Sequence, residues 1–317
     1  MRIENLLFLL GGSLKSSPAI SSITSITTDP SRVKRGSLFI AKEKSTIPQA
    51  LTNGAYAILY EGWVQISDQE IAWIKVESLE DAIKRLFRFL LIQKGPAIYC
   101  LDPLTMDIAK SMLEDPTLLY SSGDMAKDLE LLATHEPQTM LFFTESYFQS
   151  LQLECTPLSQ RPLTIIQPYL FETTFLFEGR YYHRFPLSPL FQKELQTILS
   201  LAHERMLSPR LTTPSHFIPL FLGPRYEIVE FGRSERVLVH EPSPALAKRA
   251  LEFLRTSAPS AQIQALSSQK LEGFEQVSCV EELKKILYNR PFRYALFVGE
   301  AYQWERLMQR AYQPTLL

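Results

Sequence analysis

Residues 36–41 read Gly-Ser-Leu-Phe-Ile-Ala, and residues 53–60 read Asn-Gly-Ala-Tyr-Ala-Ile-Leu-Tyr. Both stretches are apolar and rich in residues that favour strands. Residues 47–53 lie between them and predict a helix, and Gly54 marks its end because glycine suits the turn that follows a helix. A strand, a helix and a second strand in this order indicate an α/β fold.

The same alternation continues on both sides of this stretch. Residues 3–10 carry apolar side chains at helical spacing and precede Gly11-Gly12, which predicts a short helix and its end. We expect strands near residues 20–26 and 71–76, and an amphipathic helix over residues 82–90 that ends near Gly95-Pro96. Residues 1–93 are therefore assigned to a first α/β domain.

The middle of the chain, residues 94–220, begins with the ingredients of a βαβ unit. Strands are expected at residues 97–101 and 140–144, with a helix around residues 108–113. An irregular, proline-marked stretch follows. It leads to a hairpin with strands at residues 173–177 and 180–185, and then to a helix over residues 191–206. These elements form a second domain.

The last part of the chain, residues 221–317, alternates strands and helices. Strands are expected at residues 226–231, 237–240, 261–266 and 294–298, and helices at residues 245–255, 280–287 and 302–312. This alternation predicts a small, Rossmann-like, doubly wound sheet. The whole chain is therefore expected to be a three-domain α/β protein.

The composition excludes several classes of function. The 317 residues carry 33 Lys and Arg against 34 Asp and Glu, so there is no basic field to hold a nucleic-acid backbone. The longest apolar run near the start, residues 6–10, is far shorter than the ~20 residues of a membrane-spanning helix. We expect a folded protein with no nucleic-acid partner and no membrane span.

The three cysteines, Cys100, Cys155 and Cys279, lie far apart in the sequence. Their spacing matches neither a disulfide framework nor a zinc site. We therefore expect unpaired thiols, which suit a reducing cytoplasm.

Four motifs of the first domain occur in a familiar order: residues 6–12, residues 23–29 (Ile-Thr-Ser-Ile-Thr-Thr-Asp), residues 36–41 and residues 53–57. In the last domain, residues 223–227 (Gly-Pro-Arg-Tyr-Glu), the helix after Pro244 and the strand and turn at residues 294–299 fit the same order. The sequence resembles the Mur ligases, the family that adds amino acids to UDP-muramyl peptides, with MurF-type and MurE-type members closest. The resemblance implies a bacterial, cytoplasmic protein of peptidoglycan biosynthesis. It also implies a UDP-substrate domain, a central ATPase-type domain that is truncated here, and a Rossmann-like C-terminal domain.

In this resemblance the phosphate loop of the ATPase-type domain is degenerate. Matching residues 110–113 to the family's K-E-M-L places the loop's glycines at Asp102 and Thr105, its lysine at Met106 and its magnesium-binding threonine at Asp107. Glycine N–H groups and a lysine are what hold the phosphates of ATP. No Gly-Lys dipeptide occurs anywhere in the chain, so the loop is not displaced to another position.

The residues around this position also disfavour phosphate. Pro103 removes one N–H group, and Asp102 and Asp107 would place two carboxylates against a triphosphate. We therefore expect a compact turn after the strand at residues 97–101, a helix that starts near Thr105, and no anion cradle between them.

Further nucleotide and metal positions of the family are altered. The second magnesium ligand falls on Phe143, which cannot bind Mg²⁺, and Glu145 is the nearby carboxylate that could replace it. The region of the family's modified lysine and metal-binding histidine is largely deleted. The adenosine-contacting positions compress to residues 240–244, where His240 is either a ligand or base, or a histidine that is exposed or capped at a strand end.

The substrate pocket of the first domain is less altered. Asp29 matches the family's aspartate, but Pro30 and Ser31 stand where serine and arginine are expected, and Arg32 is one position out of register. A one-residue bulge would restore Ser31 and Arg32 as contacts for the nucleotide end of a UDP-muramyl peptide. The alternative is that Asp29 caps a turn and residues 32–35 form a solvated basic face.

Other candidate sites have weaker support. His183, His203 and His216 have no cysteine or carboxylate at metal-ligand spacing and are interpreted as ordinary polar residues. The sequence contains no G-x-S-x-G motif and no Cys-His signature for nucleophilic catalysis. Aromatic residues around the hairpin predict a packed face rather than a ligand cage, or a partner surface if they are exposed. They are Phe171, Phe175, Phe177, Tyr181, Tyr182 and Phe185.

These observations lead to three hypotheses. The first is a degenerate, inactive Mur-ligase-like protein with no catalytic residue, metal or cofactor, which binds a UDP-muramyl peptide or a cell-wall enzyme in the cytoplasm. The second is an active, ATP-dependent UDP-N-acetylmuramoyl-peptide ligase that uses ATP and Mg²⁺ at an atypical site. The third is an unrelated binding module that reuses these domains. Stabilisation by nucleotide separates the ligase from the other two.

Overall fold

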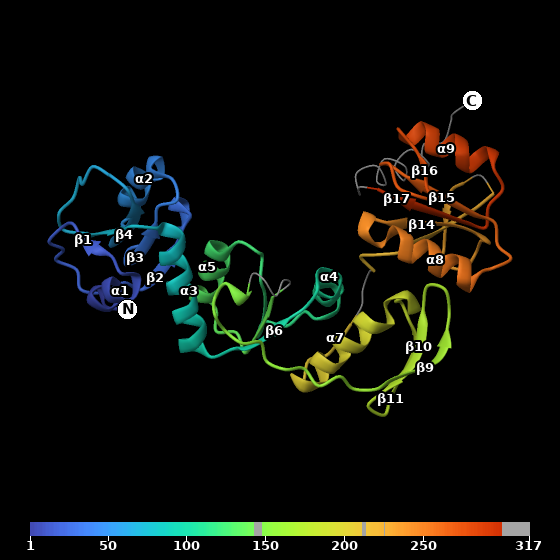
Figure 1. Ribbon diagram of the computed structural model, residues 1–317, viewed down its shortest axis with the longest axis horizontal. Coiled ribbons are helices and arrows are strands. Elements are labelled where there is room, and N and C mark those ends of the chain that lie inside the picture. Colours follow the sequence, from blue (N-terminus) through green and yellow to red (C-terminus); the bar gives the residue numbers. More distant parts are fainter. Residues whose placement is uncertain (143–147, 211–213, 225, 300–317) are drawn as a thin grey trace. The chain divides into compact units, whose positions relative to one another are not determined.

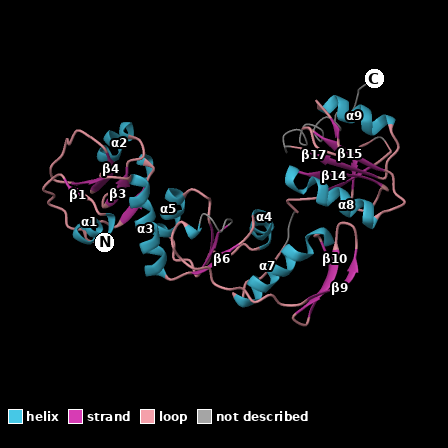
Figure 2. Cartoon of the chain, viewed as in Figure 1, coloured by secondary structure: helices cyan, strands magenta, loops and turns pink. Residues whose placement is uncertain are grey.

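The computed structural model describes residues 1–142, 148–210, 214–224 and 226–299 (Figure 1). They form two compact units, one of residues 1–106 and 114–158, and the other of residues 107–113 and those from 159 onward. Each unit contains both helices and sheets (Figure 2). The α/β fold class is confirmed. The three domain boundaries stay a prediction, because each compact unit spans more than one sheet.

The larger sheet of the first unit is built on the stretch of sequence at residues 36–60. Its strand order is β1-β5-β4-β3-β2, with β2 to β5 parallel and β1 antiparallel to β5. The elements are β1 Ser13–Leu14, β2 Ser25–Thr27, β3 Ser37–Ile40, β4 Ala57–Glu61, β5 Ala72–Val76, α1 Ile3–Leu10, α2 Ile47–Thr52 and α3 Leu79–Lys94. The predicted strands and helices of residues 1–93 are confirmed, and the β-prone run at residues 20–26 contributes only its end to β2.

This sheet is buried on both faces. On β3, Leu38 and Ile40 lie in one apolar cluster with α1 and α3, whereas Phe39 lies in a second cluster with α2. On β5, Ile74 lies in the first of these clusters and Trp73 in the second. A parallel sheet covered by helices has two apolar faces, which explains why these strands read as continuous apolar runs.

The sequence sets both ends of α3. Ser78 Oγ accepts the Asp81 N–H at 3.2 Å, and Glu80 and Asp81 place negative charge in the first turn. At the other end Gly95 adopts the left-handed conformation and donates its N–H to Leu91 O at 2.9 Å. The helix therefore presents a defined N-terminal end, which matters for the site described below.

The smaller sheet of the first unit has three parallel strands in the order β6-β8-β7. The elements are β6 Ala97–Cys100, β7 Leu118–Tyr120, β8 Thr139–Phe142, α4 Pro103–Met112 and α5 Met125–Thr134. Leu129 and Leu132 of α5 belong to the same apolar cluster as Leu86 and Phe87 of α3. Strands β6 and β8 confirm the prediction, whereas β7 and α5 were not predicted.

Cys100 and Cys155 form a disulfide, with their Cα atoms 6.2 Å apart. The expectation of unpaired thiols is therefore wrong for these two residues. The chain returns along β6, where Thr156 N donates to Ile98 O at 2.5 Å and Ile98 N donates to Thr156 Oγ1 at 3.0 Å. Spacing along the sequence does not reveal such a return. The cysteines therefore no longer support a reducing compartment, and the cytoplasmic location stays a prediction.

The second unit contains a three-stranded antiparallel sheet in the order β11-β10-β9 and the helix α7. The elements are β9 Leu163–Pro168, β10 Thr173–Phe177, β11 Arg180–Phe185 and α7 Gln192–Glu204. The predicted hairpin and helix are confirmed, and β9 adds a strand that was not predicted.

The second unit also contains a six-stranded sheet in the order β13-β12-β14-β17-β15-β16. Strands β14 to β17 are parallel, and β12 and β13 add an antiparallel edge. The elements are β12 Ile218–Leu222, β13 Ile228–Val229, β14 Arg236–Glu241, β15 Ile263–Ser267, β16 Glu275–Gln276, β17 Tyr294–Val298, α8 Ala247–Ser257 and α9 Val280–Asn289.

The Rossmann-like prediction holds for the parallel part of this sheet. The strand predicted at residues 226–231 is shorter than expected, and β12 was not predicted. The helix predicted at residues 302–312 lies outside the described residues.

A partly buried ion pair joins α7 to α8 inside the second unit. Arg249 Nη1 and Nη2 donate to the two carboxylate oxygens of Glu194 at 2.6 and 3.0 Å, and the Glu194 side chain is 7% exposed. Such bidentate pairs are among the stronger polar contacts in proteins. In the part of the chain that the structure describes, none of the helices combines the length and apolar character that a membrane span requires.

Candidate functional site

The turn before α4 is where the aligned phosphate loop would lie. Asp102 caps the helix, because its Oδ1 accepts the Thr105 N–H at 3.0 Å and its Oδ2 accepts the Thr105 hydroxyl at 2.5 Å. Pro103 is the first helical residue, where its fixed φ suits the helix and its missing N–H breaks no helical bond. The strand, turn and helix follow in the predicted order, but the helix begins at Pro103 rather than near Thr105.

The Asp102 carboxylate takes the place that a bound phosphate would need. The first N–H groups of a helix attract anions, because they carry the positive end of the helix dipole. Here the anion is a side chain of the protein itself. Thr105 and Met106 are 2% and 1% exposed, so neither offers a polar group to a ligand in solvent. The aligned residues form a capped helix start, and Asp107 is exposed on the helix that follows.

Asp29, Ser31 and Arg32, the predicted substrate residues, lie together at a short 3-10 helix, Pro30–Arg32. Asp29 Oδ1 accepts the Ser31 hydroxyl at 2.6 Å and the Ser31 N–H at 2.8 Å. These two bonds, with the Arg32 guanidinium 3.5 Å away, lower the pKa of Asp29. Asp29 is thus a turn cap, and the Arg32 side chain is 74% exposed. Their role in substrate binding stays a prediction.

A hollow of about 510 Å³ lies in the same unit, between the N-terminal ends of α3 and α5. It is called the Lys42 hollow here and is lined by Lys42, Leu79, Glu80, Ile83, Lys84, Gly123, Asp124, Met125, Ala126 and Ser150. Two lysines and two helix starts attract anions, and the carboxylates of Glu80 and Asp124 in the same lining oppose them. Sequence analysis did not predict this hollow, and the three substrate residues above are not among its lining.

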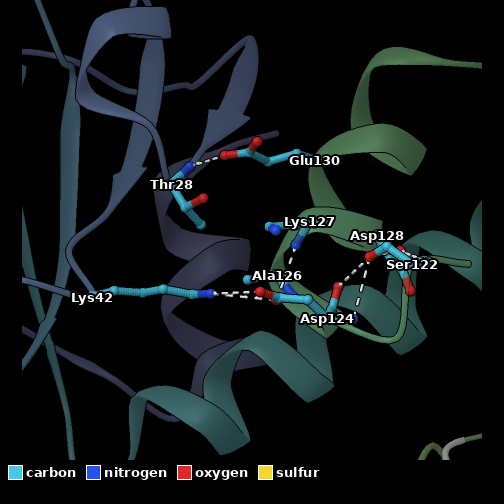
Figure 3. Close-up of polar contacts among 8 residues, drawn as sticks. All are labelled: Thr28, Lys42, Ser122, Asp124, Ala126, Lys127, Asp128 and Glu130. Carbon is cyan, nitrogen blue, oxygen red and sulfur yellow. Dashed lines mark hydrogen bonds and ion pairs between the residues drawn. The ribbon is translucent and has the colours of Figure 1, made fainter. Parts of the chain in front are cut away.

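Lys42 reaches across the hollow to the start of α5 (Figure 3). Its Nζ lies 3.3 and 3.4 Å from the two carboxylate oxygens of Asp124. Asp124 also caps α5 by accepting the Ala126 and Lys127 N–H groups at 2.9 and 3.3 Å. Burial on its own raises the pKa of Asp124, but the two N–H groups and Lys42 together outweigh it and lower that pKa. Asp124 is therefore an ionised cap.

Two more carboxylates of α5, those of Asp128 and Glu130, accept hydrogen bonds from neighbouring segments of the first unit (Figure 3). Asp128 is fully buried and accepts the Ser121 hydroxyl at 2.6 Å and both the N–H and the hydroxyl of Ser122 at 2.7 Å. Glu130 accepts the Thr27 hydroxyl at 2.9 Å and the Thr28 N–H. Both carboxylates therefore satisfy groups of the protein rather than facing a ligand.

A ligand anion in the Lys42 hollow would compete with Asp124. The side chains of Lys42 and Asp124 are 45% and 40% exposed, and an ion pair of this kind is worth less than about 1 kcal/mol. A diphosphate would draw Lys42 away from Asp124, whose carboxylate keeps its bonds to the Ala126 and Lys127 N–H groups. Lys84 is the second available ammonium group, since it lies 4.0 Å from the exposed Asp81.

The second unit contains a buried histidine–carboxylate pair that sequence analysis missed. Glu241, at the end of β14, is fully buried and lies 2.8 Å from His216 Nδ1. It also accepts the N–H groups of Phe217 and Ser243 at 3.0 and 2.8 Å. The pair fixes the start of β12 against the end of β14. Within the described ranges, no three His, Cys, Asp or Glu side chains converge to hold a metal ion.

His240 lies next to this pair and is 2% exposed. Its Nε2 lies 3.0 Å from the Gly299 carbonyl at the end of β17, so the capped alternative is observed and the exposed one is wrong. Burial lowers the pKa of His240, and the Gly299 carbonyl opposes that effect only in part. The other nucleotide-site positions, Phe143 and Glu145, lie outside the described residues.

The structure separates the aromatic residues of the hairpin into two groups. Phe175 and Phe177 are buried, as a packed face requires, and Phe175 stacks on Tyr182 with ring centroids 4.6 Å apart. Tyr181 is 59% exposed, and Phe171 contacts the six-stranded sheet rather than the hairpin.

Asp124, which sequence analysis did not identify, lies in a sequence pattern that is typical of a helix start. Ser121 to Asp124 read Ser-Ser-Gly-Asp just before a run of helix-forming residues, and aspartate is a favoured N-cap. That pattern would have placed the start of α5. The pairing of His216 with Glu241 has no such signal, because 25 residues separate the two.

Comparison with known proteins supports one fold. No protein-family model matches the sequence, and no curated protein sequence matches it. Solved structures do match. A UDP-N-acetylmuramoylalanyl-D-glutamyl-2,6-diaminopimelate--D-alanyl-D-alanyl ligase from Acinetobacter baumannii is 11% identical, with a TM-score of 0.58 over 98% of both chains.

A second structure, of MurF from Acinetobacter baumannii, is 11% identical, with a TM-score of 0.60 over 98% of both chains. A MurF ligase from Thermotoga maritima, solved with ADP, is 13% identical, with a TM-score of 0.57 over 90% of this chain and 96% of that one. At this identity the likeness shows the fold alone. The chain has the fold of the Mur ligases, as its motifs predicted.

Proposed function

We propose that this chain, which has the Mur ligase fold, is a degenerate member of that family that binds a cell-wall precursor without ATP-dependent ligase activity. The observation that carries the proposal is the bond of the Asp102 carboxylate to the Thr105 N–H in the first turn of α4. A carboxylate at that position repels phosphate, and Pro103 supplies no N–H to replace the one that Asp102 has taken. In this proposal the protein has no catalytic residue and uses neither ATP nor Mg²⁺.

The precursor would bind through the first unit. Arg32 offers an exposed guanidinium on a turn that Asp29 holds in place, and Lys42 and Lys84 offer ammonium groups in the Lys42 hollow. Guanidinium and ammonium groups are suited to a diphosphate. The ligand class we propose is therefore a UDP-muramyl peptide, recognised at its nucleotide end.

The loss of nucleotide binding is tested by thermal unfolding with Mg²⁺-ATP and with Mg²⁺-ADP. A nucleotide at about 100 times its Kd would add roughly 2.7 kcal/mol to the free energy of unfolding and raise Tm by several degrees. We expect no change in Tm with either nucleotide. A rise that depends on nucleotide concentration would favour the active ligase instead.

Precursor binding is tested by calorimetric titration with UDP-N-acetylmuramic acid. We expect a Kd in the micromolar range or weaker, and a loss of at least about tenfold in Arg32→Ala, because charge-assisted hydrogen bonds contribute about 1.5–3 kcal/mol. Arg35→Ala is the matched control, since Arg35 carries the same charge nearby but donates to the Tyr56 hydroxyl at 2.9 Å. Equal losses in both variants would indicate unspecific attraction. Absence of heat from the unmutated protein would leave a cell-wall enzyme as the partner.

A further inference from the structure

A second pocket, of about 320 Å³, lies within the second unit and has a lining unlike the first. It is called the Arg184 pocket here. Five rings, two guanidinium groups and two carboxylates line it, those of Tyr169, Phe171, Phe221, Phe231, Tyr294, Arg184, Arg293, Glu172 and Glu235. Tyr294 begins β17, and Val237 near the start of β14 also lines the pocket. The pocket thus lies at the N-terminal edge of the parallel strands. Ligand sites of doubly wound sheets lie at the opposite edge.

The backbone of Arg184 is held in an unusual conformation. Its φ is 47°, in the left-handed region that residues with a Cβ rarely adopt. The register shifts here, because three residue steps of β11 face two of β10 between Thr173 and Phe175. The Arg184 N–H donates to the buried Thr174 hydroxyl at 3.0 Å instead of to the strand ladder. Bulges of this kind often redirect a side chain that has a role of its own.

The redirected side chain is fixed by two contacts in the pocket. Arg184 Nε donates to Glu172 Oε2 at 2.7 Å, and the guanidinium lies 5.3 Å from the ring centroid of Tyr169. The Glu172 side chain is 15% exposed, whereas that of Arg184 is 50% exposed. The bond to Glu172 uses the Nε–H, so the two terminal nitrogens carry the donors that a ligand would meet. Glu172 positions this arginine for a second carboxylate.

The rings supply an apolar wall beside these donors. Phe171 packs edge-on to Phe221 and Tyr294, with centroids 6.1 and 6.2 Å apart, and Phe221 holds Phe231 at 4.8 Å. Phe231 is nevertheless 50% exposed. An aromatic side chain that is supported from behind and open in front provides a stacking surface.

We propose that the Arg184 pocket binds a small molecule in which a planar ring carries a carboxylate. The ring stacks on Phe231 and its neighbours, and the carboxylate accepts hydrogen bonds from the terminal nitrogens of Arg184, with Arg293 as a second cation at the rim. The volume of the pocket suits a molecule of one ring, because ligand pockets of about 300 Å³ lie at the small end of the usual range. A simple aromatic acid and an aromatic amino acid share this chemistry.

Fluorine NMR titration of the full chain tests the proposal with 4-fluorobenzoate, its uncharged analogue 4-fluorobenzamide and 4-fluorophenylalanine. We expect saturable binding of the benzoate and binding of the amide that is weaker by about tenfold or more, since a bidentate arginine contact requires the carboxylate. Tighter binding of 4-fluorophenylalanine than of 4-fluorobenzoate would identify the ligand as an aromatic amino acid. Tighter binding of the benzoate would identify it as a simple aromatic acid. No saturable binding of either acid at about 10 mM, or equal binding of acid and amide, would overturn the proposal.

Two variants test whether binding depends on the proposed contacts, and a third serves as the control. Arg184→Gln keeps a donor for Glu172 but lacks the charged fork, and we expect it to weaken binding of the tighter acid by about tenfold or more. Arg180→Gln is the matched control on the same strand, because Arg180 lines a different pocket. Phe231→Ala removes an exposed ring, so the fold is expected to survive while affinity falls. Unchanged binding in Arg184→Gln and Phe231→Ala would contradict the proposal.

Discussion

The start of α4 in the first unit and the bulge at Arg184 in the second unit use a charged side chain in opposite ways. At α4 the Asp102 carboxylate satisfies the N–H and the hydroxyl of Thr105, which belong to the protein itself. At the bulge the backbone of Arg184 is strained, its N–H is satisfied by Thr174, and the charged group extends into a pocket.

In our two proposals, the chain has lost a ligand site at α4 and has one at the Arg184 bulge. A charged group that caps its own helix stabilises the fold, and its removal costs stability alone. A half-exposed charged group on a strained backbone adds little to the stability of the fold. We therefore infer that it serves to bind a ligand. The first unit contains several groups of the former kind, and the predictions below test whether each carboxylate there is structural.

The largest effect is expected for Asp128→Ala. This buried carboxylate accepts three hydrogen bonds from Ser121 and the exposed Ser122, and its loss leaves the buried Ser121 hydroxyl without its acceptor. We expect the free energy of unfolding to fall by about 3 kcal/mol or more, as measured by urea unfolding. The control is Asp81→Ala on exposed α3, where the loss should stay below about 1 kcal/mol. Similar losses in both would remove the distinction between buried and exposed carboxylates.

Asp102→Ala is expected to have an intermediate effect. Loss of an N-cap costs about 0.5–2 kcal/mol of stability, and no nucleotide binding should appear, because Pro103 and the buried Met106 remain. Urea unfolding measures the first quantity, and thermal unfolding with Mg²⁺-ATP tests the second. A Tm that rises with ATP in this variant, but not in the unmutated chain, would show that Asp102 blocks a site that is otherwise intact.

His240 is expected to make the stability of the fold depend on pH. Burial lowers its pKa in the folded chain below the ordinary 6.5. As the pH falls through 6.5, the unfolded chain therefore takes up a proton on this residue before the folded chain does. The stability contribution is complete above that pH and decreases below it. We expect the urea midpoint to fall between about pH 7.5 and pH 5.5, and to fall less in His240→Gln. An equal fall in both would exclude His240 as the cause.

The smallest effect is expected for Lys42→Met. The pair with Asp124 is half exposed, so its loss should change the free energy of unfolding by less than about 1 kcal/mol, and less at high salt. Calorimetric titration with UDP-N-acetylmuramic acid should nevertheless show weaker binding if the Lys42 hollow holds the diphosphate. Lys34→Met is the control, since Lys34 does not line the hollow. Equal affinity in all three proteins would exclude the hollow from precursor binding.

The sequence predicted the elements whose signals are local. The apolar runs of β3 and β4 and the terminating Gly95 each act within a few residues of where they stand. The predicted start of α4, near Thr105, lies two residues after the observed one. The reason is the Asp-Pro pair at residues 102–103, because aspartate is a favourable N-cap and proline a favourable first helical residue.

The features that were missed depend on contacts between distant parts of the chain. Cys100 meets Cys155, and His216 meets Glu241, because strands bring them together, and neither pairing leaves a pattern in the sequence. The bulge at Arg184 is also invisible from the sequence, since an arginine at positive φ has no composition signature. The sequence thus indicated which residues align with the family's phosphate loop, but not how Asp102 uses its carboxylate.

The lengths of the outer strands affect how copies of this chain meet one another. Both outer strands of the six-stranded sheet, β13 and β16, are two residues long, and those of the five-stranded sheet, β1 and β2, are two and three residues long. The outer strand β11 is longer but carries Arg180, His183 and Arg184. Short or charged outer strands give a second molecule little backbone to extend by hydrogen bonding. At high concentration the five- and six-stranded sheets are therefore protected from growing into one another. The uncharged outer strand β9 of the three-stranded sheet is six residues long and lacks this protection.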